Sequence, residues 1–450
     1  MANAALLERD LSKPAPNAFL KTLLPRLEAQ KLVGDGESLA QLQRRARLML
    51  PEIPIPSRRD EDWLFTDLSG LFSLNYQPAE PCPLGAESLE PFILPESQGS
   101  RLVFVNGHYA PELSDLSALP QGVYVGNLAG LSPQRREKLP AYLSAGENDF
   151  FSALNSAGLQ DVAVVWADAE TVVKTPLHLL FLAIPGATPL LIQPRLLIVA
   201  EAQSQITLAE SYGAVVENCS DIPQKRPYFN NAVADIYLRD GTRVTHTRNQ
   251  RDSGDAFHIA RTLVHQGQAS RYQLVDVNLG AGLSRHNPEI RQDGAATESQ
   301  LLGLTAIAGR QVADTHSAVY LNHPQGAVKQ LHKCIVDDYA QAVFNGKILV
   351  PQAAQLTNAS QLNRNLMLSP KARINTKPEL QITADNVKCA HGATISQLEA
   401  DEIFYLQSRG LNDNDARHLL LDAFAGEILD QIPLPSLAQR LKQCIACRTL

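Results

Sequence analysis

The sequence lacks any long hydrophobic run. No stretch of 18 or more apolar residues occurs, and a membrane-spanning helix needs about that length. The longest apolar stretches, Leu177–Pro185 and Leu196–Ala202, have the length of strands and contain a proline or a glutamate. The first 19 residues include acidic side chains and no unbroken apolar segment, unlike a secretory signal. We therefore expect no membrane span and no export.

Clusters of basic residues are also missing. The chain of 450 residues carries a formal net charge of −7, and its sequence pI is near 5.9. Because binding to nucleic acid relies on a basic patch, we do not expect nucleic acid as a partner. The hydrophobic content of 44% is ordinary for a globular core. The length accommodates two or three domains, or one solenoid with end pieces.

Cysteine is sparse, and its positions suggest no disulfide framework. Without an export signal, scattered cysteines are better interpreted as reduced thiols, which predicts a reducing, cytoplasmic location. Cys444 and Cys447 form a C-x-x-C pair near the C-terminus, but neither a βαβ pattern nor a second cysteine pair accompanies them. We interpret these two as incidental. The six cysteines are Cys82, Cys219, Cys334, Cys389, Cys444 and Cys447.

Common catalytic signatures are absent as well. The sequence contains no G-x-x-x-x-G-K-[ST] loop, no G-x-S-x-G, no H-E-x-x-H and no EF-hand loop. Gly280-Ala281-Gly282 is followed by Arg285 where a dinucleotide-binding fingerprint needs glycine. The chain is therefore not expected to be an ATPase, and no residue is assigned a catalytic role. Seven histidines show no consistent spacing with carboxylates: His178, His246, His258, His265, His286, His316 and His323.

Between residues 161 and 395 the sequence consists of many short strand-like segments. Turn residues separate them, including Gly241, Gly267, Gly294, Gly326 and Asn345-Gly346, and their uneven spacing fits coils with corners of variable length. A sandwich, a propeller and a β-solenoid all agree with this pattern, and polar residues on both sides of many strands favour the solenoid narrowly. The expected strands are Val162–Trp166, Leu177–Ile184, Pro194–Val199, Gln205–Leu208, Ala232–Leu238, Thr242–Thr247, His258–Val264, Arg271–Val277, Gln300–Ala308, Ala318–Leu321, Val328–Val336, Ala342–Phe344 and Lys347–Val350.

Helical patterns flank this series of strands. Residues 1 to about 60 are expected to be mainly helical, with the run Pro51–Pro56 ending the second helix. Residues 75–100 are rich in proline, glycine and serine and resemble a linker. A short helix is expected at Phe151–Ala157.

Two helices are expected after residue 395. Ser396 with Glu399 forms a capping-box pattern, and Asn412 or Asp413 can cap the second helix. Because the open end of a solenoid needs cover, we expect this pair to act as a cap. The predicted apolar stripe of the second helix is Ala416, Leu419, Leu420, Ala423, Phe424 and Ile428.

Cys389 and His391 form the strongest candidate site. They are two residues apart, which on a strand directs both side chains to one face, and Gly392 leaves the backbone open to close approach. A thiolate beside an imidazole can bind Fe, Zn or Cu, or act as a nucleophile with its base. An iron–sulfur cluster needs four ligands, so two from this chain would have to be completed by another chain.

His332 and Cys334 repeat this spacing and form a secondary candidate pair. The adjacent Lys333 would favour a thiolate if it lay close to the sulfur. A buried histidine and a core cysteine explain the same pattern without any metal.

The segment Lys377–Gly410, KPELQITADNVKCAHGATISQLEADEIFYLQSRG, resembles the C-terminal part of the SufB/SufD family of iron–sulfur cluster assembly scaffolds. Arg58–Leu68 resembles the R-x-x-E-x-W-x-x-T-x-L segment near the N-terminus of that family, and Phe151–Ala157 resembles another family segment. Arg285-His286-Asn287-Pro288 also resembles the family and is interpreted as a turn. In the B subunit a glutamate follows the histidine; Gly392 here favours the D type.

The resemblance implies a mainly β protein with a right-handed parallel β-helix core, flanked by N-terminal and C-terminal helical regions. We place a mostly helical region with a linker at 1–160, the β-helix at 161–395 and a helical region at 396–450. A non-catalytic scaffold role follows, with a SufB-like subunit and a SufC-like ABC-type ATPase as partners, and a homodimer when isolated. Partner-binding residues are expected at the C-terminus: Phe404, Tyr405, Arg409 and Phe424.

The resemblance implies no cofactor stably bound by the lone chain, but a transient iron–sulfur cluster or iron in the complex, contacted by His391 and Cys389. Two alternatives stay open. A B-type scaffold should carry more cysteines in its core than Cys219 and Cys334. A β-helical enzyme acting on polysaccharide would need acidic residues on one face, and Asp337-Asp338 is the only suggestive pair in the core.

Overall fold

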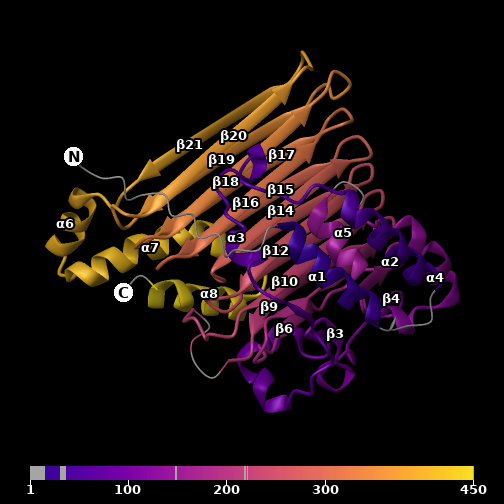
Figure 1. The fold of residues 1–450 in the computed structure, drawn as a ribbon. Helices are drawn as coiled ribbons and strands as arrows, with labels where there is room; N and C mark the ends of the chain where they lie inside the picture. Colours follow the sequence, from indigo (N-terminus) through magenta and orange to yellow (C-terminus); the bar gives the residue numbers. More distant parts are fainter. Residues whose placement is uncertain (1–15, 31–36, 147–148, 217–218, 220, 449–450) are drawn as a thin grey trace, which may run out of the picture.

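A computed structural model describes residues 16–30, 37–146, 149–216, 219 and 221–448. Its centre is a parallel β-helix, in which the chain winds alternately through two sheets (Figure 1). The expected fold class is confirmed. The first 15 residues, on which the export argument depends, lie outside the described part.

Sheet 1 lies on the side of the N-terminal helices. Along its main path the strands pair in parallel, except for the antiparallel β4. Its strands are β4 (Val123–Asn127), β5 (Ala163–Ala167), β8 (Arg195–Ala200), β10 (Tyr228–Leu238), β12 (Phe257–Gln266), β14 (Leu283–Gln292), β16 (Val312–Tyr320), β18 (Gln341–Val350) and β20 (Arg373–Ile382), with β1 (Gln77–Pro78) and β7 (Leu190–Ile192) beside them.

Sheet 2 faces it across the interior. Its strands are β3 (His108–Tyr109), β2 (Arg101–Val105), β6 (Leu177–Ala183), β9 (Gln205–Ala214), β11 (Arg243–Arg251), β13 (Arg271–Asn278), β15 (Glu298–Ile307), β17 (Ala327–Val336), β19 (Asn358–Met367) and β21 (Lys388–Ser396). The helices are α1 (Pro16–Ala29), α2 (Glu37–Met49), α3 (Ser69–Phe72), α4 (Pro133–Lys138), α5 (Phe150–Ala157), α6 (Ala400–Ser408), α7 (Asp413–Leu429) and α8 (Pro435–Arg448).

The coils differ in length at their corners. One row of registered residues in sheet 2 contains residues 205, 243, 271, 298, 327, 358 and 388. The coil from 205 to 243 takes 38 residues, and each later coil takes 27 to 31. The strands keep their register while the corners vary, which explains why the sequence shows no sharp repeat. The turn expected at Asn345-Gly346 is wrong, because both residues lie inside β18.

Side chains alternate between the interior and the outer face of each sheet, as a pleated strand requires. In β13, Leu274 belongs to the interior core, whereas Val275 and Val277 contact the C-terminal helices on the outer face. Some strands are therefore apolar on both faces, and their hydrophobic residues make them recognisable in the sequence. Others, such as β14, β19 and β20, carry many polar residues and were not predicted.

The N-terminal helices cover the outer face of sheet 1. Phe229 and Ile259 from that face join a core with α1, α5 and the segment around Trp63. The Trp63 ring lies 3.7 Å from the Arg285 guanidinium carbon, and Arg285 Nη1 donates to Asp314 Oδ2 at 2.8 Å. The expected turn at Arg285–Pro288 is therefore wrong: these residues belong to β14, which docks the N-terminal segment.

The C-terminal helices do not close the open end of the β-helix. Leu421, Ala425 and Ile428 of α7 pack against apolar residues on the outer face of sheet 2. The outer face of sheet 2 offers α7 a large apolar surface. Burying this surface is more favourable than covering the open end of the β-helix. Beyond β20 and β21 no further strand is paired in the described part of the chain, and these two strands form the outermost layer (Figure 1).

Two details of these helices differ from expectation. Glu399 precedes α6 and makes no side-chain cap, so the predicted capping box is wrong, whereas Asn412 caps α7 by accepting from Asp415 N. Leu419 is exposed, so the predicted stripe is rotated from the true one. None of the described helices is both long and apolar enough to span a membrane.

Candidate functional site

Cys389 and His391 lie on β21, the last strand of sheet 2. They pair in register with Ala359 and Gln361 of β19. Cys389 is partly buried against the interior core, and His391 is exposed. Burial raises the pKa of the Cys389 thiol, opposed by a hydrogen bond with the Ala359 backbone. The two side chains therefore lie at the rim of the open end, where another molecule can reach them.

The described residues offer no complete metal site. No group of three or more His, Cys, Asp or Glu side chains among them could hold a metal ion. The rim supplies one sulfur and one imidazole, two of the four ligands of a cluster. Gly392 is not required by packing within this chain, because an added Cβ would meet only Leu362 Cδ1 at 3.5 Å.

His332 and Cys334 lie deep inside the coil on β17 and are almost fully buried. The His332 ring stacks on Phe344 with centroids 4.8 Å apart, and its Nε2 lies 3.2 Å from Thr305 Oγ1. Burial lowers the pKa of His332 to about 4 and raises the pKa of Cys334 to about 12. A neutral imidazole and a protonated thiol in this setting are core side chains.

Lys333 does not activate Cys334. As the intervening residue of the strand it lies on the outer face, where its Nζ donates to the Phe424 carbonyl at 2.8 Å and pairs with Glu427. The condition for a lysine-assisted thiolate is therefore not met, since alternation places the two side chains on opposite faces.

The interior of the coil contains a polar network that sequence spacing did not reveal. His246 Nε2 lies 2.8 Å from Glu210 Oε2, and His258 Nδ1 lies 2.8 Å from Asp252 Oδ2. All four side chains are buried.

Asp276 joins this network to the opposite sheet. Its carboxylate contacts Arg248 Nη1 at 3.0 Å and His286 Nδ1 at 2.7 Å. Burial opposes its ionisation, but the charges of His286 and Arg248 outweigh burial and hold the pKa of Asp276 well below its usual range. The partners come from different strands, so no fixed sequence spacing could have found them. Removing one member of such a buried pair leaves an uncompensated charge, so the network depends on all of its members.

The expected partner-binding residues divide into two groups. Phe404 and Tyr405 of α6 are 70% and 57% exposed, and the Arg409 guanidinium lies 5.3 Å from the Tyr405 ring centroid. Phe424 is half-buried, with Lys333 Nζ 4.4 Å from its ring centroid. Two large aromatic side chains thus remain uncovered on α6.

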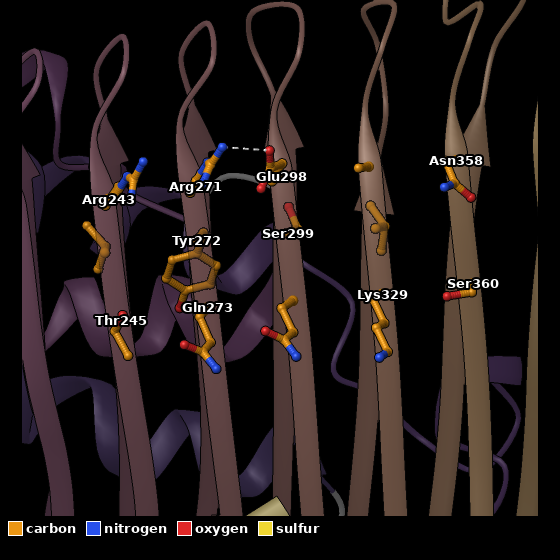
Figure 2. Close-up of a pocket in the computed structure, with 14 residues that line it drawn as sticks. Arg243, Thr245, Arg271, Tyr272, Gln273, Glu298, Ser299, Lys329, Asn358 and Ser360 are labelled. Carbon is orange, nitrogen blue, oxygen red and sulfur yellow. Dashed lines mark ion pairs between the residues drawn. The ribbon is translucent and has the colours of Figure 1, made fainter. Parts of the chain in front are cut away.

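A groove of about 530 Å³ crosses the outer face of sheet 2 at the beginning of its strands (Figure 2). Its lining is a ladder of polar side chains, and Arg271 and Glu298 on neighbouring strands form an ion pair of 3.1 Å (Figure 2). The Arg271 and Glu298 side chains are about half exposed and already paired with each other. They therefore do not indicate a specific ligand for the groove. Its polar lining includes Arg243, Thr245, Gln273, Gln300, Lys329 and Ser360.

Two family models match the chain. Residues 183–424 match the SufBD core domain of the SUF system for iron–sulfur cluster assembly, and residues 29–179 match the SufBD N-terminal region.

Similar proteins agree with these matches. An iron–sulfur cluster assembly SufBD family protein of Synechocystis is 57% identical over 99% of this chain and 100% of its own length. The chloroplastic protein ABCI7 of Arabidopsis thaliana is 35% identical, covering 84% of this chain and 80% of its own length. The iron–sulfur cluster assembly protein SufD of Escherichia coli is 29% identical over 86% of this chain and 88% of its own length. The chain therefore belongs to the SufBD family of the SUF iron–sulfur cluster assembly system.

Proposed function

We propose that this chain is a D-type scaffold subunit that pairs with a homologous B-type subunit through the open end of its β-helix. Cys389 and His391 then contribute half of the ligands for a cluster or iron ion that is handed on as cargo. A B-type chain completes the site, and an ABC-type ATPase docks at the C-terminal helices. This proposal depends on one observation: Cys389 and His391 form an incomplete ligand set on β21, the last strand of sheet 2.

The free edges of β20 and β21 support pairing. Unpaired backbone groups of an edge strand form hydrogen bonds readily with another strand. Apolar side chains at the same end are exposed to solvent: Leu362, Ile382 and Ile395 are 39%, 38% and 48% exposed. A second parallel β-helix would satisfy the edges and cover these residues. The same surface would mediate a homodimer of the isolated chain.

The position of the two ligands supports a shared site. His391 is exposed at the rim, and Cys389 is partly covered by the interior core. A partner across the edge can approach both without unfolding the coil. His332 and Cys334 lie inside the coil, so the proposal does not depend on them.

The exposed aromatic pair on α6 supports docking of the ATPase subunit. Phe404 and Tyr405 lie on the helix that follows β21, so an ATPase bound there would act close to the rim. Movement of α6 could then change access to Cys389. A reducing compartment, cytoplasmic or its equivalent in a plastid, would keep that thiol available.

The first experiment tests whether Cys389 and His391 act as ligands or only contribute to the packing of the chain. His391→Ala and Cys389→Ser are purified alone and with the B-type subunit and ATPase, and iron and sulfide are measured after anaerobic reconstitution. We expect normal folding, normal complex formation and loss of most of the cluster, whereas the exposed control Thr394→Ala retains it. A complex of either variant with a full cluster would contradict the ligand assignment.

The second experiment tests pairing. Ile395→Glu places a charge at the open end and should weaken co-purification with the B-type subunit by at least tenfold, while Leu419→Glu on the exposed side of α7 should not. The lone wild-type chain should show no ATPase activity and no stoichiometric cluster. A well-populated cluster on the lone chain would overturn the shared site.

A further inference from the structure

Two cysteines far apart in the sequence line one cavity on the outside of the β-helix. Cys219 follows β9, and Cys444 lies on α8, which packs along sheet 2. They line a cavity of about 400 Å³ together with residues of β6, β9 and β11. Cys447, the other half of the C-x-x-C pair, is exposed and does not line it.

Arg251 contacts one of the two thiols, that of Cys219. Its Nη2 lies 3.7 Å from Cys219 Sγ, and its Nε lies 3.6 Å from Asp221 Oδ1. Burial raises the pKa of Cys444, and Arg251 opposes that shift. The exposed Cys219 is therefore the accessible nucleophile, and the half-buried Cys444 is the more protected thiol.

His178 places an unpaired ring nitrogen in the wall of this cavity. The imidazole lines the cavity and is 1% exposed. Its Nε2 lies 3.0 Å from Ser211 Oγ, whereas its Nδ1 has no hydrogen-bond partner among the described residues. A buried ring nitrogen without a partner is costly, and a bound water, hydroxyl or peroxide would satisfy it.

We propose that Cys219 and Cys444 form a two-thiol site that small peroxides oxidise to a disulfide. The Cys219 thiolate attacks one oxygen of hydrogen peroxide, the O–O bond breaks, and water leaves after protonation. The resulting sulfenic acid is attacked by the Cys444 sulfur, which forms the S–S bond and releases a second water. Two thiols lose two electrons in total, and the peroxide gains them.

The disulfide would fasten α8 to the β-helix. At present α8 is held by apolar contacts of Leu437, Leu441 and Ile445 and by the Arg448–Asp221 ion pair. A covalent link between Cys219 and Cys444 closes a long loop and restricts the unfolded chain, so the oxidised form is more stable. Protein disulfides in reducing compartments are typically transient and redox-sensing.

The test uses the full-length chain. Reduced protein is treated with one to a few equivalents of hydrogen peroxide, free thiols are blocked, and disulfide-linked peptides are identified by mass spectrometry. We expect one intramolecular link, Cys219–Cys444, and a rise in Tm of several degrees that a reductant reverses. Cys447→Ser should behave like the wild type, whereas Cys219→Ser and Cys444→Ser should lose both the link and the shift.

Three results would overturn the proposal: a Cys444–Cys447 link, a link between two copies of the chain, or no disulfide at all. The peptide map of the wild-type chain is decisive even if a serine variant folds poorly. The reduced Cys219→Ser and Cys444→Ser proteins are compared with reduced wild type by circular dichroism, so that loss of the link is not mistaken for misfolding.

Discussion

Asp276 Oδ2 lies 2.7 Å from His286 Nδ1 across the interior of the coil. Asp276 belongs to β13 of sheet 2 and His286 to β14 of sheet 1, so this contact joins the two walls of the β-helix. An interior with charged groups depends on keeping every partner in place, because an isolated buried charge is highly unfavourable. Substitutions in this network should therefore change the stability of the protein by amounts that can be measured.

Removing the charge of Asp276 should be strongly destabilising. Asp276→Asn leaves Arg248 buried without its carboxylate, and breaking such a pair typically costs about 3–5 kcal/mol. Glu298→Gln, which breaks the half-exposed pair with Arg271, should cost no more than about 1 kcal/mol. Urea unfolding of both variants measures the difference, and equal losses would show that the interior pair contributes no more than the surface pair.

Stability should fall as the pH is lowered from 7 towards 5. Burial lowers the pKa of His332 to about 4, so between that pH and the ordinary value near 6.5 only the unfolded chain binds the proton. Stability is therefore lost as the pH falls through this window, by up to about 1.4 kcal/mol per pH unit for one histidine. His332→Gln should reduce the slope of unfolding free energy against pH, whereas the exposed His323→Gln should not. An unchanged slope in His332→Gln would contradict this assignment.

Gly303 should tolerate no side chain. A Cβ built there lies 2.0 Å from His332 Nδ1, and the stacked Phe344 limits retreat of that ring. We expect Gly303→Ala to destabilise the chain by about 1–3 kcal/mol and the added substitution His332→Ala to remove the clash. Gly392→Ala, where the nearest atom is 3.5 Å away, should leave the isolated chain as stable as before. Thermal unfolding measures the loss of stability in each variant. Similar losses for Gly303→Ala and Gly392→Ala would refute the steric argument.

Lys333→Met should loosen α7. The substitution removes the hydrogen bond to the Phe424 carbonyl and the ion pair with Glu427, at a cost of about 1–3 kcal/mol. Hydrogen exchange in α7 should accelerate, while Lys371→Met, which removes an exposed contact with Tyr339, should leave it unchanged. Unaltered exchange in Lys333→Met would mean that apolar contacts alone hold the helix.

The sequence determined much of this protein on its own. Apolar runs with turn residues between them located β13 and β17, and Asn412 located the beginning of α7, because these signals are local. The string around Cys389 identified the family, which the domain matches confirm.

Only the tertiary structure decided which distant residues meet. Successive coils bring Asp276 to His286, and the packing of α8 on sheet 2 places Cys219 and Cys444 around one cavity. No fixed sequence spacing indicates either arrangement. The place of α7 on the outer face of sheet 2 likewise followed from apolar surface offered by several strands at once. A linear pattern shows which side chains one strand turns inward; the stacking of coils determines what lies opposite them.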